Sequence, residues 1–336
     1  MMVRSAHLRR HFGPHARRDS MKRWIVPTAL PAALLLALLV DRGQAQEQEE
    51  RFVEIDTLNV RDTLYHLGEG GANGLALIDE INGGVILVGT KLPGWGQPVI
   101  DAVYQVTDLP VTTIINTHSD RDHTGANSEF PDVTEIIAHE NTAANMARMD
   151  LFAGSAAGLP NTTFTDRFGL LEDLDRVELY YFGPAHSDGD IVVVFPQKRT
   201  AYLGELFPDK AAPVIDTANG GSGIAFPETL AKVVEAIDGV DRVITAHAPI
   251  PTTYAGRGRR DRGERRAWTG WLTWDDLREY ADFNRDFLTA VRASHEAGRS
   301  VDEAAANLDL PERYADYGME QARANVEAIY AELEGR

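Results

Sequence analysis

The sequence of 336 residues contains no cysteine. This absence excludes disulfide bonds, thiolate zinc sites, a cysteine nucleophile and a lipid-modified N-terminal cysteine. Basic residues are also in the minority, with 33 Lys and Arg against 51 Asp and Glu and a formal net charge of -18. Because nucleic-acid binding needs basic side chains to neutralise phosphates, this balance argues against a general nucleic-acid-binding protein.

The remaining composition is typical of a globular protein, with 43% hydrophobic and 25% charged residues. The length allows one large domain or two ordinary ones. The sequence has no repeat of fixed period and no low-complexity tract. A folded domain with its own hydrophobic core is therefore expected.

The N-terminal region has the form of a secretory signal peptide. Lys22 and Arg23 precede an apolar run over residues 24–40, and small residues stand before a cleavage site near Ala45. A membrane-spanning helix is the alternative, but the run of about 17 residues is short for one and contains prolines. We predict a signal peptide at 21–45, an extended or mis-started N-terminus at 1–20, and a periplasmic or secreted bacterial protein without a stable membrane anchor.

The mature chain opens with short apolar strands separated by glycine-rich turns, which predicts an antiparallel meander. Its strands are expected at residues 52–55, 63–67, 75–78 and 85–88. Segments in which apolar residues recur at helical spacing then alternate with further strands. Helices are expected at 98–107, 141–149 and 227–237, and strands at 111–116, 135–138, 177–182, 190–195, 200–203 and 243–246. This order indicates two sheets covered by helices.

The C-terminal part divides into an arginine-rich segment and a helical extension. Residues 257–266 hold six arginines and are predicted to be a solvated linker paired with acidic residues, the alternative being a site that recruits an anionic substrate or nucleic acid. From 267 to 336 the pattern is helical, with Trp268, Trp271 and Trp274 at a three-residue step. Such a stripe is typical of a buried helix face.

Side chains able to bind metal follow several of the predicted strands. They are His118, Asp120, Asp122 and His123 after the strand at 111–116, then His186, Glu205 and His247 after three later strands. The ends of strands are where α/β proteins place their sites, because the sheet fixes the backbone while the loop presents side chains. One histidine after a strand is usually structural, but four coincidences of the same kind predict a metal site.

These motifs, in this order, resemble those of the metallo-β-lactamase fold superfamily. The family signature is H-x-H-x-D-H after a strand, a histidine in a glycine-containing turn, an aspartate in a G-D turn, and a histidine after the last strand. The resemblance covers about residues 50–256, and Gly70-Gly71-Ala72-Asn73 is similar to the family's opening hairpin. It implies an α/β fold, an αββα four-layer sandwich, here followed by a C-terminal helical extension.

Three positions depart from the family pattern. Asp120 replaces the second histidine of the signature, Glu205 replaces the bridging aspartate, and Gly89 stands where an acidic residue often ends the fourth strand. The resemblance implies two divalent ions, which are held by the following groups. His118, Asp120 and His186 bind metal one, Asp122, His123 and His247 bind metal two, and Glu205 bridges them. Zinc is implied by the family, whereas the carboxylate-rich set favours iron or manganese.

The predicted function is metal-dependent hydrolysis, in which a metal-bound hydroxide attacks an ester-like bond of a small molecule, such as a lactam, lactone or thioester. Asp122 is the candidate catalytic residue, since it would orient the water and accept its proton. Loop residues that could bind substrate are Trp95, Asn219, Gly221 and Ser222, although ordinary loops have the same composition. The alternatives are a di-iron redox protein of the same fold and a catalytically weak metal- or ligand-binding homologue.

Overall fold

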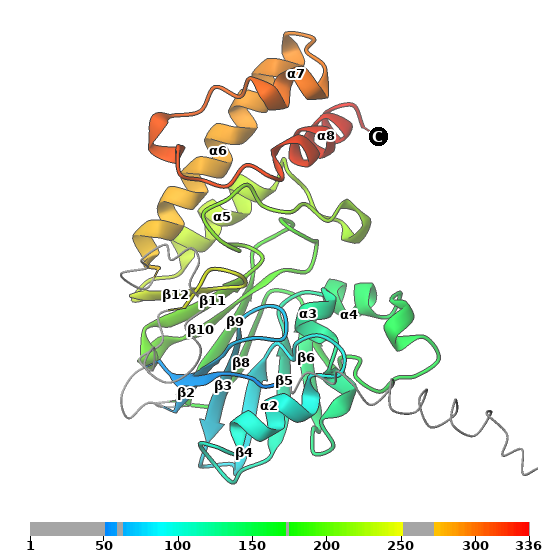
Figure 1. Ribbon diagram of the computed structural model, residues 1–336, viewed down its shortest axis with the longest axis vertical. Helices are drawn as coiled ribbons and strands as arrows, with labels where there is room; N and C mark the ends of the chain where they lie inside the picture. The colour runs from blue at the N-terminus through cyan, green and yellow to red at the C-terminus, as the bar shows by residue number, and fades with distance from the viewer. Residues whose placement is uncertain (1–50, 59–62, 173–174, 251–271, 336) are drawn as a thin grey trace, which may run out of the picture. The chain divides into compact units, whose positions relative to one another are not determined.

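The computed structural model describes residues 51–58, 63–172, 175–250 and 272–335 (Figure 1). The predicted signal peptide and the arginine-rich segment lie outside these residues, as do Ala45, Trp268 and Trp271, so those interpretations stay predictions. Within the described part, no helix combines the length and the apolar character needed to cross a membrane.

The first sheet has seven strands whose order in space equals their order in the chain. They are β1 (Ile55–Thr57), β2 (Leu64–Leu67), β3 (Gly74–Asp79), β4 (Gly84–Val88), β5 (Val111–Asn116), β6 (Glu135–His139) and β7 (Thr162–Phe164). Strands β1 to β4 pair antiparallel, which confirms the predicted meander, and β4 to β7 pair parallel. The first strand begins at Ile55 instead of residue 52, and Phe52 is exposed.

The second sheet has five strands in the order β12-β11-β10-β9-β8. Their bounds are β8 (Arg167–Leu170), β9 (Val177–Tyr181), β10 (Ile191–Phe195), β11 (Thr200–Gly204) and β12 (Arg242–Thr245). The β11–β12 pair is parallel and the other pairs are antiparallel. Neither β7 nor β8 was predicted, because both are short and carry no continuous apolar run.

The alternation of side chains along β10 explains how the layers stack. Ile191, Val193 and Phe195 pack into a core between the two sheets, together with side chains of β3 and β4. Val192 and Val194 point to the opposite face and pack against helices. A strand that is buried on both faces reads as a continuous apolar run, which is why β10 was predictable from the sequence.

Helices cover the outer face of each sheet. They are α2 (Gly96–Val103), α3 (Arg121–Thr124), α4 (Glu140–Met146), α5 (Phe226–Ala236), α6 (Trp274–Glu296), α7 (Val301–Ala306) and α8 (Ala322–Leu333). Helix α2 packs on the first sheet, while α5, α6 and α8 share a core with the second (Figure 1). The structure is therefore the predicted four-layer αββα sandwich with a helical extension.

The extension begins with a well-defined start signal at α6. The side chain of Thr273 accepts a hydrogen bond from the backbone of Asp276, and Asp276 reciprocates, which forms a capping box. Trp274 is buried at the first turn, as its predicted place in a core stripe requires. Because α6 and α8 contribute buried side chains to the core over the second sheet, the extension is packed onto the sandwich.

Candidate metal centre

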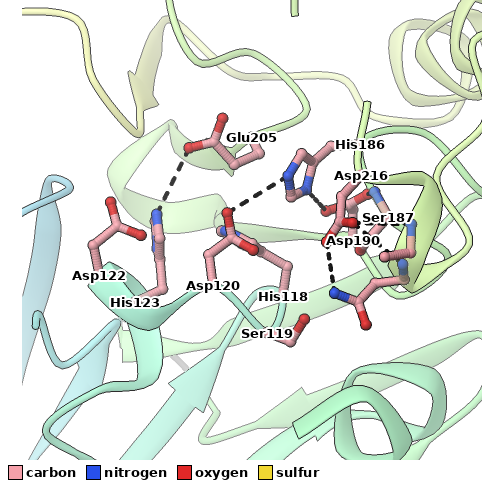
Figure 2. A network of polar contacts seen from close by, with 12 residues as sticks. His118, Ser119, Asp120, Asp122, His123, His186, Ser187, Asp190, Glu205 and Asp216 are labelled. Atoms are coloured by element: carbon pink, nitrogen blue, oxygen red, sulfur yellow. Dashed lines mark hydrogen bonds and ion pairs between the residues drawn. The ribbon is translucent and has the colours of Figure 1, made fainter. Parts of the chain in front are cut away.

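The seven predicted ligands converge at one edge of the two sheets, and Figure 2 labels all of them except His247. His118 follows β5, and Asp120 is the N-terminal cap of the short helix α3 that carries Asp122 and His123. The other three ligands come from the second sheet, where His186 lies between β9 and β10, Glu205 directly follows β11, and His247 follows β12. The first sheet and the second sheet therefore each contribute ligands to a shared site.

The first predicted ligand group is linked through Asp120. Its Oδ2 atom lies 3.8 Å from Nε2 of His118 and 3.6 Å from Nε2 of His186. Donor atoms around one tetrahedral ion with bonds of about 2.1 Å stand roughly 3.4 Å apart. The two separations from Asp120 are therefore close to those that one shared ion requires.

The second predicted group is compact as a complete set. The donor atoms of Asp122, His123 and His247 lie within 4.8 Å of one another, and so do those of His118, His123 and Glu205. Glu205 Oε1 is 2.7 Å from Nε2 of His247 and 3.9 Å from Nε2 of His123. Both of these histidines belong to the second group, and the donor atom of Glu205 also lies within 4.8 Å of that of His118 in the first group, a position that suits a bridging ligand.

Two of the buried imidazoles have an unpartnered nitrogen directed at this cluster. Nε2 of His118 and Nε2 of His123 are buried and have no hydrogen-bond partner among the described residues. Buried polar atoms are otherwise nearly always hydrogen-bonded, because leaving one unpaired costs about 1–3 kcal/mol. A metal cation can bind the lone pairs of both nitrogen atoms. The donor set therefore fits a metal centre.

The Nδ1 atoms of the three buried candidate ligands, His118, His123 and His186, lie beside three different groups. No sequence motif indicated these groups. Nδ1 of His118 lies 3.0 Å from Oγ1 of Thr117, and Nδ1 of His186 lies 3.2 Å from Oδ1 of Asp190. A carboxylate only accepts hydrogen bonds, so it favours a proton on Nδ1 and leaves Nε2 free to bind metal. The spacing of Asp190, four residues after His186, is the one signal that could have revealed such a partner.

The third group, the hydroxyl of Tyr202, and Gly89, which departs from the family pattern, both lie beside Nδ1 of His123. Gly89 has a φ of 76°, and a Cβ atom placed on it would lie 3.6 Å from Nδ1 of His123. An acidic side chain at this position would therefore face that nitrogen. Instead, the hydroxyl of Tyr202 lies 3.5 Å from Nδ1 of His123 and donates a hydrogen bond to the carbonyl of Asn73 at 2.6 Å. The neutral phenol of Tyr202 thus contacts the nitrogen of His123 that would face an acidic side chain in the family pattern.

Burial and charge set the protonation of the ligands. Burial, reinforced by neighbouring histidines, holds the pKa of His118 well below its usual range, and burial lowers the pKa of His123 to about 4. Both rings are therefore neutral at pH 7, as metal ligands must be. Burial, together with the carboxylates of Glu205 and Asp122, raises the pKa of Asp120 to about 6. Cations bound here would relieve that crowding of negative charge.

The turn between β2 and β3 supports the centre from the side of the first sheet. Asn73 donates backbone and side-chain hydrogen bonds to the carbonyls of Thr245, Ala246 and Ala248, which surround His247 in the sequence. The buried Lys91 donates from Nζ to the carbonyls of Leu67 and Ala72. The contacts of Asn73 connect the turn to the end of β12. In the sequence, the only signal for them was the glycine-rich run that ends at Asn73.

The residues predicted to bind substrate are all partly buried. The ring of Trp95 packs over Gly70, where a Cβ atom would stand 2.6 Å from it, and Gly70 precedes a glycine that contacts Asp122. Asn219 accepts a hydrogen bond from the backbone of Asp188, and Gly221 packs tightly on the carbonyl of His186. The hydroxyl of Ser222 donates to Glu332. Substrate binding by Trp95, Asn219, Gly221 and Ser222 stays a prediction.

Comparisons with known proteins agree with this geometry. A sequence profile of the Metallo-beta-lactamase superfamily matches residues 75–247. Over 99 residues the chain is 40% identical to the 2,4-dinitroanisole O-demethylase subunit alpha of a Nocardioides species, covering 29% of each protein. Over 149 residues it is 30% identical to the hydroxyacylglutathione hydrolase of a Synechocystis species, covering 43% of this chain and 51% of the relative. The chain thus spans from under a third to about half of the length of these curated relatives.

A solved structure supports the same fold. The metallo-beta-lactamase from Pontibacter korlensis superposes with a TM-score of 0.53 at 16% identity, covering 69% of this chain and 99% of that chain. At this level of identity the likeness concerns the fold alone. The family profile, in contrast, covers half of the chain and includes all seven candidate ligands. The chain therefore belongs to the metallo-beta-lactamase superfamily.

Proposed function

We propose that the protein is a metal-dependent hydrolase that cleaves an ester-like bond, such as a lactam, lactone or thioester, in a small molecule. The observation that carries the proposal is the convergence of four histidines and three carboxylates around two buried, unpartnered Nε2 atoms. Two divalent cations bound there would act as Lewis acids and lower the pKa of water.

The assignment of ligands to the two ions is the one that the family resemblance implies. His118, Asp120 and His186 would hold one ion, Asp122, His123 and His247 the other, and Glu205 would lie between them. Three of the seven donors are carboxylates, and oxygen donors favour iron or manganese more than the nitrogen-rich sets that suit zinc. Zinc remains the metal expected from the family.

The exposure of the ligands indicates the side from which a substrate would arrive. The side chains of Asp120, Asp122 and His247 are 37%, 25% and 46% exposed, whereas the remaining ligands are buried. Asp122 thus combines a place in the cluster with access to solvent. Its carboxylate would orient a water molecule and accept the proton which that water loses during attack.

The experiment combines metal analysis of the purified protein with a substrate panel. The panel contains a lactam, a lactone and a thioester, and also the compounds in the names of the relatives, an acylated glutathione and 2,4-dinitroanisole. We expect two ions per chain, hydrolysis of at least one compound, and loss of that activity with a chelator. Asp122→Asn should lower kcat at least about 100-fold, while Asp132→Asn, an exposed control, should have no effect. Hydrolysis that resists complete metal removal contradicts the proposal.

A di-iron redox protein is the second candidate, favoured by the carboxylates at Asp120 and Glu205. Iron with an optical spectrum and no turnover of the panel would support it. The double variant Asp120→His and Glu205→Asp restores the residues typical of the family. If this variant hydrolyses a compound that the parent leaves intact, the parent is not an efficient hydrolase.

A further inference from the structure

The loop over residues 216–223 lies between helix α8 and the turn that carries His186. On the side of α8, both oxygens of the Glu332 carboxylate are engaged by this loop. The hydroxyl of Ser222 donates to one at 2.5 Å, and the backbone N–H of Gly223 donates to the other at 2.7 Å. Hydrogen bonds to a charged acceptor are roughly twice as strong as neutral ones, so this contact fixes the loop firmly on α8.

On its other side, the same loop holds the backbone on both sides of the His186 side chain. The backbone N–H of Ser222 donates to the carbonyl of Ala185 at 2.9 Å, and the N–H of Asp216 donates to the carbonyl of His186 at 2.8 Å. A Cβ atom on Gly221 would stand 2.1 Å from the carbonyl oxygen of His186. Because the loop and the turn are in such close contact, a displacement of the loop displaces His186.

Packing in the core fixes the position of α8. Val326 and Ile329 of α8 are fully buried in the core that includes α5, α6 and the second sheet. A Cβ atom on Gly223 would stand 2.5 Å from Cγ1 of Ile329, so the loop and the helix touch without a gap. The position of Glu332 is thus determined by the whole helical extension.

The extension also contacts the segment that follows Glu205. The backbone of Gly318 exchanges hydrogen bonds with this segment, donating to the carbonyl of Lys210 and accepting from the N–H of Ala212. The carbonyl of Pro208, in the same segment, accepts hydrogen bonds from the N–H groups of His247 and Ala248. The extension therefore supports the loops of two ligands of the second sheet, His186 and His247.

We propose that Glu332 is a positioning residue for His186, and that the helical extension is thereby a working part of the metal centre. The inference rests on the proposed function, since it assigns a role toward the ions that the centre would bind. Glu332 lies outside the part of the chain that the family profile matches. The affinity of the ion held by His186 is thus set in part by a helix that follows the family domain in the sequence.

The test uses the variants Glu332→Ala and Glu332→Gln in the full chain. Glu327→Ala is the matched control, because Glu327 lies on the same helix and is exposed, with its carboxylate paired to Arg323. The probe is Co²⁺, whose stepwise affinities and absorption spectrum report on the two ions separately. We expect Glu332→Ala to weaken one of the two ions about tenfold and to change its spectrum, in line with the effect of groups behind metal ligands. Glu332→Gln, which keeps an acceptor oxygen, should recover most of the affinity.

Hydrogen exchange of the metal-free protein supplies a second measurement that does not depend on ions. Backbone amides of residues 185–190 should exchange about tenfold faster in Glu332→Ala than in Glu327→Ala. If the wild-type protein binds no Co²⁺ while this difference is present, the proposed function fails and the positioning role stands. Unchanged affinities, spectrum and exchange in Glu332→Ala, with or without a lower melting temperature, would overturn the inference.

Discussion

At the scale of single residues, the buried histidines differ in the groups that hold their Nδ1 atoms. His118 faces the hydroxyl of Thr117, His186 faces the carboxylate of Asp190, and His123 faces the phenol of Tyr202. A carboxylate partner makes an imidazole more basic and a stronger ligand, whereas a hydroxyl does so less. The ion at His186 is therefore expected to bind more tightly than the ion at His123.

Removal of the Tyr202 hydroxyl tests this arrangement. Tyr202→Phe leaves the carbonyl of Asn73 and Nδ1 of His123 without that partner. The unfolding free energy should fall by about 1–3 kcal/mol, and the ion at His123 should bind about tenfold more weakly. Urea unfolding and metal titration measure the two effects. The exposed Tyr104→Phe serves as control, and an unchanged metal affinity in Tyr202→Phe would show that the phenol does not support His123.

Burial of His66 predicts a dependence of stability on pH. Burial lowers the pKa of His66 to about 4, against the opposing effect of its hydrogen bond with Asn73. In the unfolded chain the pKa of His66 is near 6.5. Between pH 4 and pH 6.5 the His66 side chain is therefore protonated in the unfolded chain and neutral in the folded protein. The unfolding free energy should therefore fall as pH falls from about 6.5 to 4, by on the order of 3 kcal/mol for this group.

Urea unfolding at pH 7 and pH 5 measures this effect. The loss of stability between the two values should be smaller in His66→Gln than in the parent. His295→Gln is the control, since His295 lies at the surface beside Glu334. An equal loss in the parent and in His66→Gln would mean that other groups carry the whole pH dependence.

At the scale of elements, the turn between β2 and β3 depends on glycine at a point of close approach. Gly71 has a φ of 115°, and a Cβ atom on it would stand 2.6 Å from Cβ of Asp122. Gly83, in the turn between β3 and β4, has a φ of 76° but no atom within 4 Å of such a Cβ. The two positions share a positive φ and differ in their surroundings.

Alanine substitutions at these glycines separate backbone strain from displacement of a ligand. Gly83→Ala should lower the unfolding free energy by about 1 kcal/mol and leave metal binding unchanged. Gly71→Ala should cost more and should also weaken the ion held by Asp122, because the helix α3 must shift. Thermal unfolding and metal titration give both quantities. Equal effects of the two substitutions on metal affinity would argue against contact between the turn and the site.

The same elements show which parts of the fold the sequence could predict. Strand β10 was found because an apolar run marks a strand that is buried on both faces. The edge strand β8 was missed, since an exposed strand needs few apolar residues and forms through pairing with its neighbour β9. Such pairing depends on tertiary structure, which local sequence does not encode.

The convergence of the candidate metal ligands was predictable for a related reason. Each follows a strand end, and their spacing matches a known signature, so motif and topology indicate the same edge. Their supporting groups lack such a signal, since Tyr202 reaches His123 from the other sheet and Glu332 reaches the turn of His186 from the helical extension. Partners that meet only after the sheets dock cannot be read from local sequence.

At the scale of the whole molecule, the metal centre connects the two sheets. His118 and His123 follow strand β5 of the first sheet, while His186, Glu205 and His247 follow strands of the second. Ions bound between them act as crosslinks that exist only in the folded state. Metal binding by the candidate centre would therefore be thermodynamically linked to docking of the sheets.

Metal removal should accordingly lower the melting temperature. At a free metal concentration of 100 times Kd, one ion stabilises the folded state by about 2.7 kcal/mol, and a chelator removes this contribution. Thermal unfolding before and after chelation, and again after metal is restored, measures the loss and its recovery. A His118→Ala variant should respond less to the chelator. No response of the parent would contradict a centre that joins the sheets.

The order of these groups along the chain also determines when the centre can assemble during synthesis. His118 and His123 leave the ribosome well before His247, and α8, which carries Glu332, follows later still. An emerging chain therefore offers only fragments of the ligand set until His247 has been made. If the centre binds metal as proposed, selection of the ion would thus be a late event, made by the completed protein in whichever compartment it finishes folding.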